Sequence, residues 1–198
     1  MQFVPGQLYH VYNRGNNHQR VFFNRENYLF FLRKVRLHLL PYCEISAYCL
    51  MPNHFHFLLW VKENPPNENP SDGFEPSDEY ALNQGLAILL RSYAQAINKQ
   101  ENRVGSLFQQ KTKAKNLQGE NQRYPFVCFQ YIHQNPLRAR IIEKMERWEF
   151  SSFCDYAGFR NGTLCNRRLA FQLLGVDSTR FYEDAYGVID PGVLEGIW

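Results

Sequence analysis

The sequence lacks several features that would place the chain in a membrane, outside the cell or among nucleotide-dependent enzymes. No apolar run in its 198 residues approaches the roughly 20 residues that span a bilayer, and the N-terminus lacks a basic segment followed by an apolar one. Its five cysteines never form a Cys-x-x-Cys pair, which argues against a disulfide framework and against a thiolate zinc site. The phosphate-binding motif G-x-x-x-x-G-K-[ST] is also absent, so no nucleotide cofactor is expected. These absences favour a cytoplasmic protein that binds no membrane and consists of one domain with an appendage.

Acidic residues are concentrated in two segments, and the rest of the chain is strongly basic. Residues 63–79 contain six acidic residues and no Lys or Arg, and residues 176–198 contain five acidic residues against Arg180 alone. Without these segments the chain has 21 basic and 8 acidic residues, although its net charge is only +3. A basic surface of this kind fits a polyanionic partner. The alternative is an ordinary solvated surface.

Basic residues interleaved with aromatic and amide side chains are the candidate contacts to nucleic acid. Alternating lysines in a strand would put their side chains on one face. Single strands are held by neutralised phosphates and by bases stacked on aromatic rings, and this mixture offers both. The residues predicted to contact DNA are Arg14, Lys111, Lys113, Lys115 and Arg138, with a path over Arg33, Lys34 and Arg36 as the alternative.

Residues 51–60 contain the most informative motif, His54-Phe55-His56, within an apolar and aromatic run. In a β-strand, side chains at i and i+2 share a face, so His54 and His56 project together while Phe55 projects to the other side. Two imidazoles on one rigid face supply half of a metal site. Strand histidines with ordinary hydrogen bonds are the alternative, and a bare His-x-His pattern fits them at least as well.

A second cluster, at residues 130–136, can supply a nucleophile and a third ligand. On a helix, Tyr131 and Asn135 are four residues apart and therefore lie on one face. Phosphodiester cleavage combines a phenol with a bis-histidine metal, because the metal withdraws charge from phosphate while tyrosine attacks phosphorus. A free phenol has a pKa of about 10 and needs such help at neutral pH. Two alternatives stay open: Tyr131 as a core tyrosine, and Asn135 as the N-cap of a helix that begins at Pro136.

Together these residues resemble the single-tyrosine HUH transposases, and specifically their REP-associated tyrosine transposase branch. The main matches are His54-Phe55-His56 and the segment YIHQNPLRA at residues 131–139. Weaker matches are LYHVYNRG at residues 8–15, GSLFQ at residues 105–109 and WEFSS at residues 148–152. Each segment alone is weak, whereas their order and spacing over residues 5–160 are specific.

The resemblance implies an assignment of the site, position by position. His54 and His56 bind a divalent metal, magnesium or manganese, and Tyr131 forms a 5′-phosphotyrosine link with DNA. Asn135 corresponds to the third ligand, which is a glutamine in the better-known insertion-sequence members, and Gln134 is the alternative. The implied substrate is single-stranded DNA, with a hairpin, and the implied reaction is cleavage and strand transfer. Family members include monomers and strand-sharing dimers, and the long C-terminal tail favours a monomer.

Hydrophobic periodicity and turn residues predict the order strand, helix, strand, strand, helix, strand. The predicted strands cover residues 7–14, 43–50, 54–61 and 106–115, and the helices run from Asn24 to Pro41 and over residues 80–100. This order is the split βαβ of a ferredoxin-like α+β fold, an antiparallel sheet with helices on one face and the other face open. The tyrosine helix is predicted at residues 124–134, with a shorter helix after Pro136.

Two units are predicted along the chain. Residues 1–146 form the catalytic domain, in which residues 63–79 are a mobile acidic loop, because they contain Pro and Gly and show no periodicity. Residues 147–198 form a C-terminal helical extension packed on that domain. Its helices are predicted at residues 167–174, ended by Gly175, and near residues 178–186.

The main alternative function is a non-catalytic nucleic-acid-binding module on the same fold, including a domesticated transposase that only binds DNA. Its aromatic sheet face would bind bases, and His54, His56 and Tyr131 would be incidental. A metal hydrolase without a covalent step fits less well, because the two histidines lack the further His, Asp or Glu cluster that two-metal phosphoesterases need. Metal-dependent covalent attachment to DNA distinguishes these functions.

Overall fold

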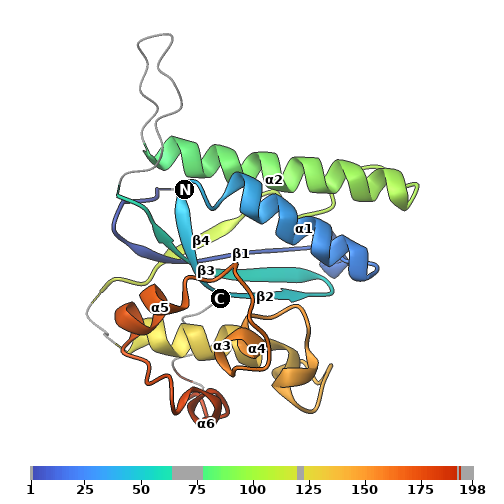
Figure 1. Ribbon diagram of the computed structural model, residues 1–198. Coiled ribbons are helices and arrows are strands. Elements are labelled where there is room, and N and C mark those ends of the chain that lie inside the picture. Colours follow the sequence, from blue (N-terminus) through green and yellow to red (C-terminus); the bar gives the residue numbers. More distant parts are fainter. Residues whose placement is uncertain (1, 64–77, 120–122, 191, 193–198) are drawn as a thin grey trace.

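The computed structural model describes residues 2–63, 78–119, 123–190 and 192, which fold around a four-stranded antiparallel sheet (Figure 1). The strands are β1 (Leu8–Arg14), β2 (Cys43–Met51), β3 (His54–Val61) and β4 (Lys113–Asn116). Their order across the sheet is β2-β3-β1-β4, and each neighbouring pair is antiparallel. With α1 (Arg25–His38) after β1 and α2 (Asp78–Gln100) after β3, this is the predicted ferredoxin-like plan.

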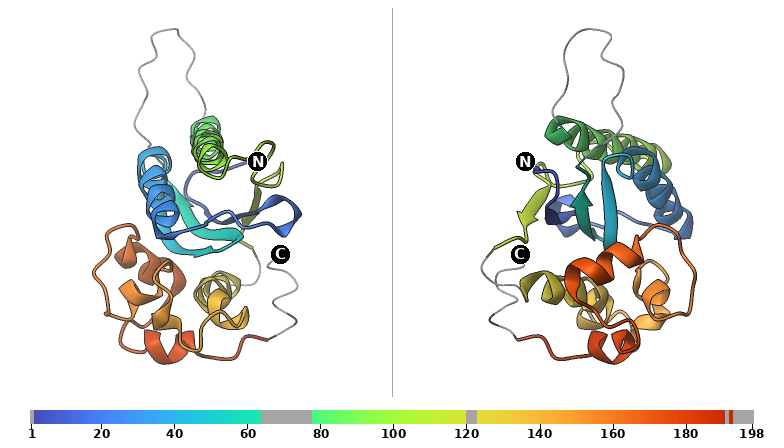
Figure 2. Two further views of the ribbon diagram at one scale, coloured as in Figure 1. Left: turned by 90° about the vertical axis from the view of Figure 1, so that its right-hand side faces the viewer. Right: turned by 60° about the vertical axis from the view of Figure 1, so that its left-hand side comes forward.

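α1 and α2 pack side by side on one face of the sheet (Figures 1 and 2). Asn24 caps α1 as predicted, because its side chain accepts from the Asn27 N–H while the Asn27 side chain accepts from the Asn24 N–H. Phe31 of α1 is fully buried, with its ring centroid 5.4 Å from that of Phe55 in β3 and 4.9 Å from that of Tyr93 in α2. This aromatic cluster joins both helices to the sheet.

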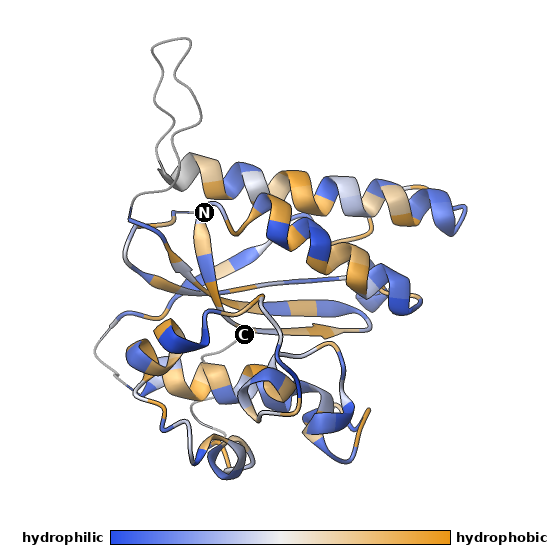
Figure 3. Ribbon diagram, viewed as in Figure 1, coloured by the Kyte–Doolittle hydropathy of each residue, from blue (hydrophilic) through white to orange (hydrophobic). Residues whose placement is uncertain are grey.

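Gly85 allows α1 and α2 to approach closely. A Cβ atom at residue 85 would lie 2.2 Å from the backbone oxygen of His38, at the end of α1. Any larger residue would therefore push the two helices apart. Figure 3 shows hydrophobic and hydrophilic bands along both helices. Within the ranges that the structure describes, no helix is long and apolar enough to cross a membrane.

α3 (Tyr124–Arg138) covers the opposite face of the sheet, against β2 and β3 (Figures 1 and 2). The sheet face that was predicted to be open is therefore covered by α3, the tyrosine helix. α3 also continues through Pro136, so the prediction of a new helix capped by Asn135 is wrong. Because Pro136 stands in the last turn, its missing N–H removes a single hydrogen bond, and the Asn135 backbone oxygen still accepts from Ala139.

β4 is shorter than the strand predicted over residues 106–115. The Asn13 side chain holds the irregular segment before it, since its Nδ2 donates to the Gln109 backbone oxygen at 3.1 Å. Lys113 and Lys115 lie in β4 two residues apart and therefore share a face, as predicted. Lys111 precedes the strand, so the prediction that all three lysines lie in one strand is wrong.

The C-terminal residues form a 3-10 turn (Met145–Arg147) and the short helices α4 (Phe153–Tyr156), α5 (Arg167–Leu174) and α6 (Phe181–Ala185). α5 has the predicted bounds and ends at Gly175, whose φ of 62° is left-handed. α6 is shorter than predicted. The segment is joined to edge strand β2, where the Leu50 N–H donates to the Phe150 oxygen at 2.9 Å. The division into residues 1–146 and 147–198 stays a prediction.

The predicted acidic loop at residues 63–79 lies largely outside the described residues, which resume at residue 78. Asp78 is the first residue of α2, so this helix begins two residues before its predicted start. Glu63, at the other end of the acidic segment, is exposed.

Candidate active site

The pairing of β1 with β3 gathers the candidate site residues on the sheet face that α3 covers. In the register, Arg14 lies opposite His54 and Tyr12 lies opposite His56. Directly opposed residues of neighbouring strands point to the same face. Phe55, between the two histidines, points instead into the aromatic cluster under α1 and α2. His54 and His56 therefore share one face, as their spacing predicts.

Each ring nitrogen of His54 faces an amide oxygen. Its Nδ1 lies 2.6 Å from Oδ1 of Asn53, and its Nε2 lies 3.4 Å from Oδ1 of Asn135 on α3. The Asn53 amide is oriented by its Nδ2, which donates to the backbone oxygen of His18, so its Oδ1 accepts the Nδ1 proton of His54. In a neutral His54, Nε2 then carries a lone pair directed at the Asn135 oxygen.

The oxygen of Asn135 also presents lone pairs to His54. Its Nδ2 donates to the Tyr131 backbone oxygen at 3.1 Å, which fixes Oδ1 on the side of the histidine. Burial lowers the pKa of His54 to about 4, and Arg14 acts in the same direction. The Asn135 oxygen, which would accept from a protonated ring, acts in the opposite direction but is outweighed by burial. No proton therefore bridges the two atoms at neutral pH. Neighbouring ligands of one divalent cation are about 3 Å apart, so this pair of atoms fits a bound cation.

His56 is completely buried beside His54. Its Nδ1 lies 2.8 Å from Nε2 of His10 on β1, and the two rings stack with centroids 5.1 Å apart. When His10 accepts the Nδ1 proton, Nε2 of His56 is the atom that can bind a metal, which is the usual arrangement for a ligating histidine. Burial lowers the pKa of His56 well below its ordinary value, and His10, His54 and Arg14 act in the same direction. Both histidines are thus neutral, as metal ligands must be.

His10 is a site residue that the sequence reasoning did not single out. Its ring stacks on those of both Tyr12 and His56, with centroid distances of 4.7 and 5.1 Å. A signal existed, because His10, Tyr12 and Arg14 alternate along β1 as the two histidines do along β3. The partner of a strand histidine depends on the register, and that pairing appears only in the folded sheet.

Tyr131 approaches the histidines from α3. Its ring lies edge-on to His56, with centroids 5.8 Å apart. Asn135 lies four residues further on the same face of the helix, as predicted. Only 5% of Tyr131 is exposed, and Ile189 of the C-terminal segment packs against it. Access of another molecule to Tyr131 therefore requires Ile189 to move.

Gln134, the alternative third ligand, points away from the histidines. Its Nε2 donates to the backbone oxygens of Ala185 and Gly187, both at 2.8 Å. Within the described ranges, no further His, Cys, Asp or Glu forms a metal-binding group with His54 and His56. Asn135 is therefore the third donor that the geometry offers, and two imidazoles with an amide oxygen suit a divalent cation.

A buried polar network fixes α3 against β2 behind the site. Nε2 of His133 lies 2.7 Å from Oγ of Ser152, and the same Oγ accepts from the Tyr48 N–H at 3.0 Å. Burial lowers the pKa of His133 to about 3, so the ring is neutral. His133 and Tyr131 lie on different faces of α3. The hydrogen bond of His133 therefore fixes the rotation of the helix about its axis, with Tyr131 directed at His56.

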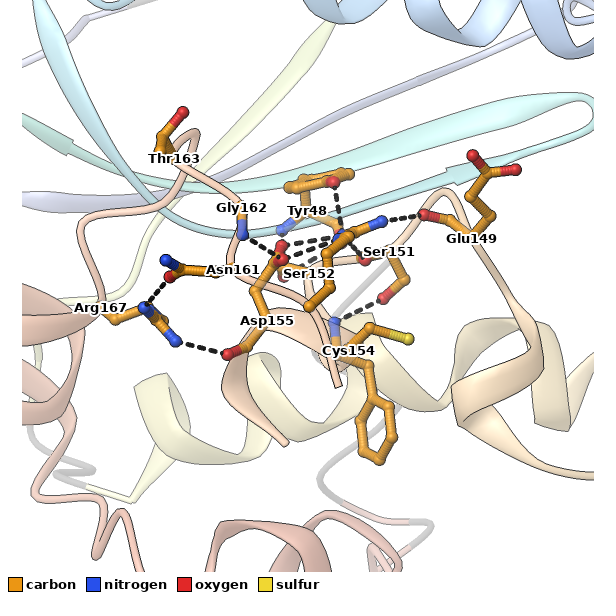
Figure 4. A network of polar contacts seen from close by, with 12 residues as sticks. Tyr48, Glu149, Ser151, Ser152, Cys154, Asp155, Asn161, Gly162, Thr163 and Arg167 are labelled. Atoms are coloured by element: carbon orange, nitrogen blue, oxygen red, sulfur yellow. Dashed lines mark hydrogen bonds and ion pairs between the residues drawn. The ribbon is translucent and has the colours of Figure 1, made fainter. Parts of the chain in front are cut away.

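Asp155 anchors the segment that carries Ser152 (Figure 4). It is 2% exposed, and its two oxygens accept from Arg160 at 2.7 and 2.8 Å. Arg160 also donates to the Ser151 backbone oxygen, and the Gly162 N–H donates to Asp155. The side-chain hydrogen bond to Asp155 raises the pKa of Arg160. The sequence reasoning missed this pair, because no local spacing marks it.

Lys113 and Lys115 border the site on the β4 side. In the register, Lys113 lies opposite Tyr12, and its Nζ is 5.6 Å from the centre of the Tyr12 ring. Nζ of Lys115 donates to the Tyr124 hydroxyl at 2.9 Å. Cations set over tyrosine rings combine phosphate neutralisation with aromatic surface.

Of the other three predicted DNA contacts, one lies beside the histidines and two lie outside the site. Arg14 is half-buried directly opposite His54 and belongs to the site. Lys111 is exposed in the segment before β4, and Arg138 is exposed in the last turn of α3. The structure thus brings together Arg14, Lys113 and Lys115, and leaves Lys111 and Arg138 at the periphery.

Comparison with known proteins bears on the fold. No protein-family model and no curated protein matches the chain. Among solved structures, the chain is similar to a REP-associated tyrosine transposase bound to a REP hairpin, with a TM-score of 0.57 and 14% sequence identity. The match covers 80% of this chain and 83% of that one. The chain therefore has the fold of a REP-associated tyrosine transposase.

Proposed function

We propose that the protein cleaves and rejoins single-stranded DNA, with Tyr131 as the nucleophile and Mg²⁺ or Mn²⁺ held by His54, His56 and Asn135. One observation carries the proposal: Nε2 of His54 and Oδ1 of Asn135 direct lone pairs at each other across 3.4 Å. Asn135 lies on the same face of α3 as Tyr131. A bound cation relieves this repulsion. The shared fold adds support, since the matched transposase is bound to a REP hairpin.

In the proposed reaction, the Tyr131 oxygen attacks a backbone phosphorus. The phenol loses its proton as its bond to phosphorus forms, while the bond from phosphorus to the 3′-oxygen breaks and that oxygen takes up a proton. When bound, the metal withdraws charge from a phosphate oxygen. Because one phosphodiester replaces another, a free 3′-hydroxyl can reverse the step onto new DNA without a nucleotide cofactor.

The substrate we propose is single-stranded DNA that contains a hairpin, acted on by a monomer. Arg14, Lys113 and Lys115 supply positive charge around the site, and the half-buried Tyr124 ring beside Lys115 offers an aromatic surface for an unpaired base. Tyr131 and His56 belong to the same chain and lie with ring centroids 5.8 Å apart, so a second copy is not needed to complete the site. Light scattering coupled to gel filtration measures this oligomeric state directly.

The decisive experiment incubates the protein with labelled single-stranded DNA from the flanks of its own gene, with Mn²⁺ or with a chelator. We expect a denaturation-resistant protein–DNA adduct only with the metal, and rejoined strands when a free 3′-hydroxyl is added. Replacement of both His54 and His56 by Ala removes two ligands and should abolish the adduct. An adduct that survives in the chelator and in the double variant would contradict the metal role, and hydrolysed ends alone would indicate a nuclease.

A non-catalytic DNA-binding protein on this fold is the second candidate. The observation that favours it is the burial of Tyr131 beneath Ile189, which keeps the ring from solvent. A protein that only binds DNA does not need access to this hydroxyl. Binding of the same oligonucleotides without an adduct, in Mg²⁺ and in Mn²⁺, would select this candidate.

A further inference from the structure

Four exposed basic residues follow one another at and beyond the end of α3: Arg138, Arg140, Lys144 and Arg147. None of their side chains makes a hydrogen bond or ion pair within the described part of the chain. Other arginines are paired, for example Arg160 with Asp155. Residues 138–147 thus carry four cations without an ion pair against Glu143 and Glu146, and this net positive charge suits an anionic partner.

The negative end of the α3 dipole explains only part of this cluster. Arg138 lies in the last helical turn, where a cation is favourable for helix stability alone. Arg140, Lys144 and Arg147 come after the helix end, where the dipole effect has fallen off. Arg140 also has a φ of 56°, a left-handed conformation uncommon for a residue with a long side chain. Helix stability therefore does not account for three of the four charges.

Two residues of the cluster, Arg140 and Arg147, line a hollow of about 610 Å³ together with Leu137, Ile141, Ile142 and Glu143. The lining thus has three aliphatic side chains, two guanidinium groups and one carboxylate. A duplex presents sugars and phosphates on its outside, whereas a single strand can place an unstacked base against an apolar wall. The guanidinium groups suit the phosphate of the same nucleotide. The lining therefore fits single-stranded DNA better than a duplex stem.

The hollow is close to the candidate active site along the same helix. Seven residues separate Tyr131 from Arg138, about 10 Å along the axis of α3. We propose that residues 137–147 bind a nucleotide of single-stranded DNA near the scissile phosphate, with its base against the aliphatic wall and its phosphate between Arg140 and Arg147. The inference rests on the proposed function and adds a binding site for the strand that enters or leaves the tyrosine.

The test replaces the two arginines of the hollow in a Tyr131→Phe background, so that binding is measured without cleavage. Arg140→Asn keeps a residue that tolerates left-handed φ, and Arg147→Gln keeps the side-chain length. The matched control, Arg91→Gln with Lys99→Gln, also removes two charges, from exposed residues of α2 on the opposite side of the sheet. Thermal melting checks that each variant is folded.

Fluorescence anisotropy with an unstructured oligonucleotide at several salt concentrations gives the readout. We expect the slope of log K against log salt to become shallower by about 1.4 in the hollow variant, about 0.7 for each phosphate that is no longer neutralised, and to stay unchanged in the control. An oligonucleotide with abasic positions should bind the Tyr131→Phe parent more weakly than the normal one, because it lacks the base that packs on the aliphatic wall.

The outcomes separate this inference from the proposed function. If the parent binds the oligonucleotide and the hollow variant shows the same slope, the nucleotide site is wrong while the proposed function stands. If the variant loses affinity only for a hairpin, the cluster binds a duplex stem and the single-strand assignment is wrong. If the parent binds no DNA at all, both proposals are wrong.

Discussion

The two faces of the sheet bury different kinds of side chain, although β3 contributes residues to both of them. Under α1 and α2, the sheet buries an aromatic cluster around Phe31, Phe55 and Tyr93. Under α3 and the C-terminal segment, the sheet buries polar groups instead, among them the His56 imidazole and the Asp155 carboxyl group. An apolar core needs matching volume, whereas each buried polar group needs its own partner. The first face should therefore control stability, and the second should control chemistry.

Replacement of the proposed nucleophile should give the largest effect on chemistry and almost none on stability. Tyr131→Phe keeps the ring that packs on Ile189 and lies edge-on to His56, and removes only the hydroxyl. We expect adduct formation to fall at least about a thousandfold, with DNA affinity and melting temperature unchanged. Tyr124→Phe is the matched control and should form the adduct. An adduct in the Tyr131→Phe protein would mean that another residue attacks.

On the other face, Phe31→Ala should show the opposite behaviour. Phe31 is fully buried between β3 and α2, so truncation leaves a cavity and should lower the free energy of unfolding by about 3–5 kcal/mol. Leu37→Ala, at an α1 residue that is 67% exposed, should change it by less than about 0.5 kcal/mol. Urea titration measures both. If adduct yield per folded molecule fell with Phe31→Ala, the two faces would not be independent.

The α1–α2 face was predictable because its signals are local. The Asn24 cap, the apolar spacing of α1 and the alternation of β3 each act within a few residues, and they give the element order and the strand pairing. The prediction erred where a distant contact decides the structure. The Asn13 side chain of β1 donates to the Gln109 backbone oxygen, in the irregular segment that was predicted to belong to β4. α3 packs on β2 and continues through Pro136, where the sequence predicted a helix end.

The candidate site was predictable only for residues that share one element. His54 with His56, and Tyr131 with Asn135, follow from strand and helix periodicity. The partners of these groups come from other elements. His10 meets His56 through the register of β1 with β3, and no spacing in the sequence predicts that pairing.

The polar face should also respond to pH through His133, with a smaller effect than the Phe31 cavity. Burial lowers the pKa of His133 to about 3, from an ordinary value of about 6.5. Between these values the unfolded chain binds a proton that the folded chain excludes, so stability falls as pH falls below about 6.5. By pH 5 this costs about 2 kcal/mol.

A comparison with His133→Gln isolates this contribution. The substitution changes the packing equally at every pH, and unfolding titrations at pH 7 and pH 5 should show a loss of stability between them that is smaller by about 2 kcal/mol than in the parent. The pH dependence is independent of the packing change, which is the same at both pH values. Equal losses in the two proteins would mean that the His133 ring is protonated in the folded state.

The smallest predicted effect concerns the charge of the metal site. The donors there are two neutral imidazoles and an amide, Arg14 lies opposite His54, and no carboxylate joins the histidines in the part of the chain that is described. In the proposed complex the protein would therefore leave the charge of a divalent cation uncompensated, and a DNA phosphate would supply the missing negative charge. We expect an oligonucleotide to tighten Mn²⁺ binding to the Tyr131→Phe protein about tenfold, or 1.4 kcal/mol.

Thermodynamic reciprocity makes this coupling measurable from both sides. Mn²⁺ must tighten oligonucleotide binding by the same factor as the oligonucleotide tightens Mn²⁺ binding, and calorimetry can determine both affinities. Arg14→Gln removes the cation opposite His54, so Mn²⁺ should bind this variant more tightly without DNA, while the oligonucleotide should bind more weakly. Equal Mn²⁺ affinity with and without DNA would show that the site compensates the metal charge by itself. The polar face would then bind its metal independently of its substrate, and the phosphate would only be positioned there.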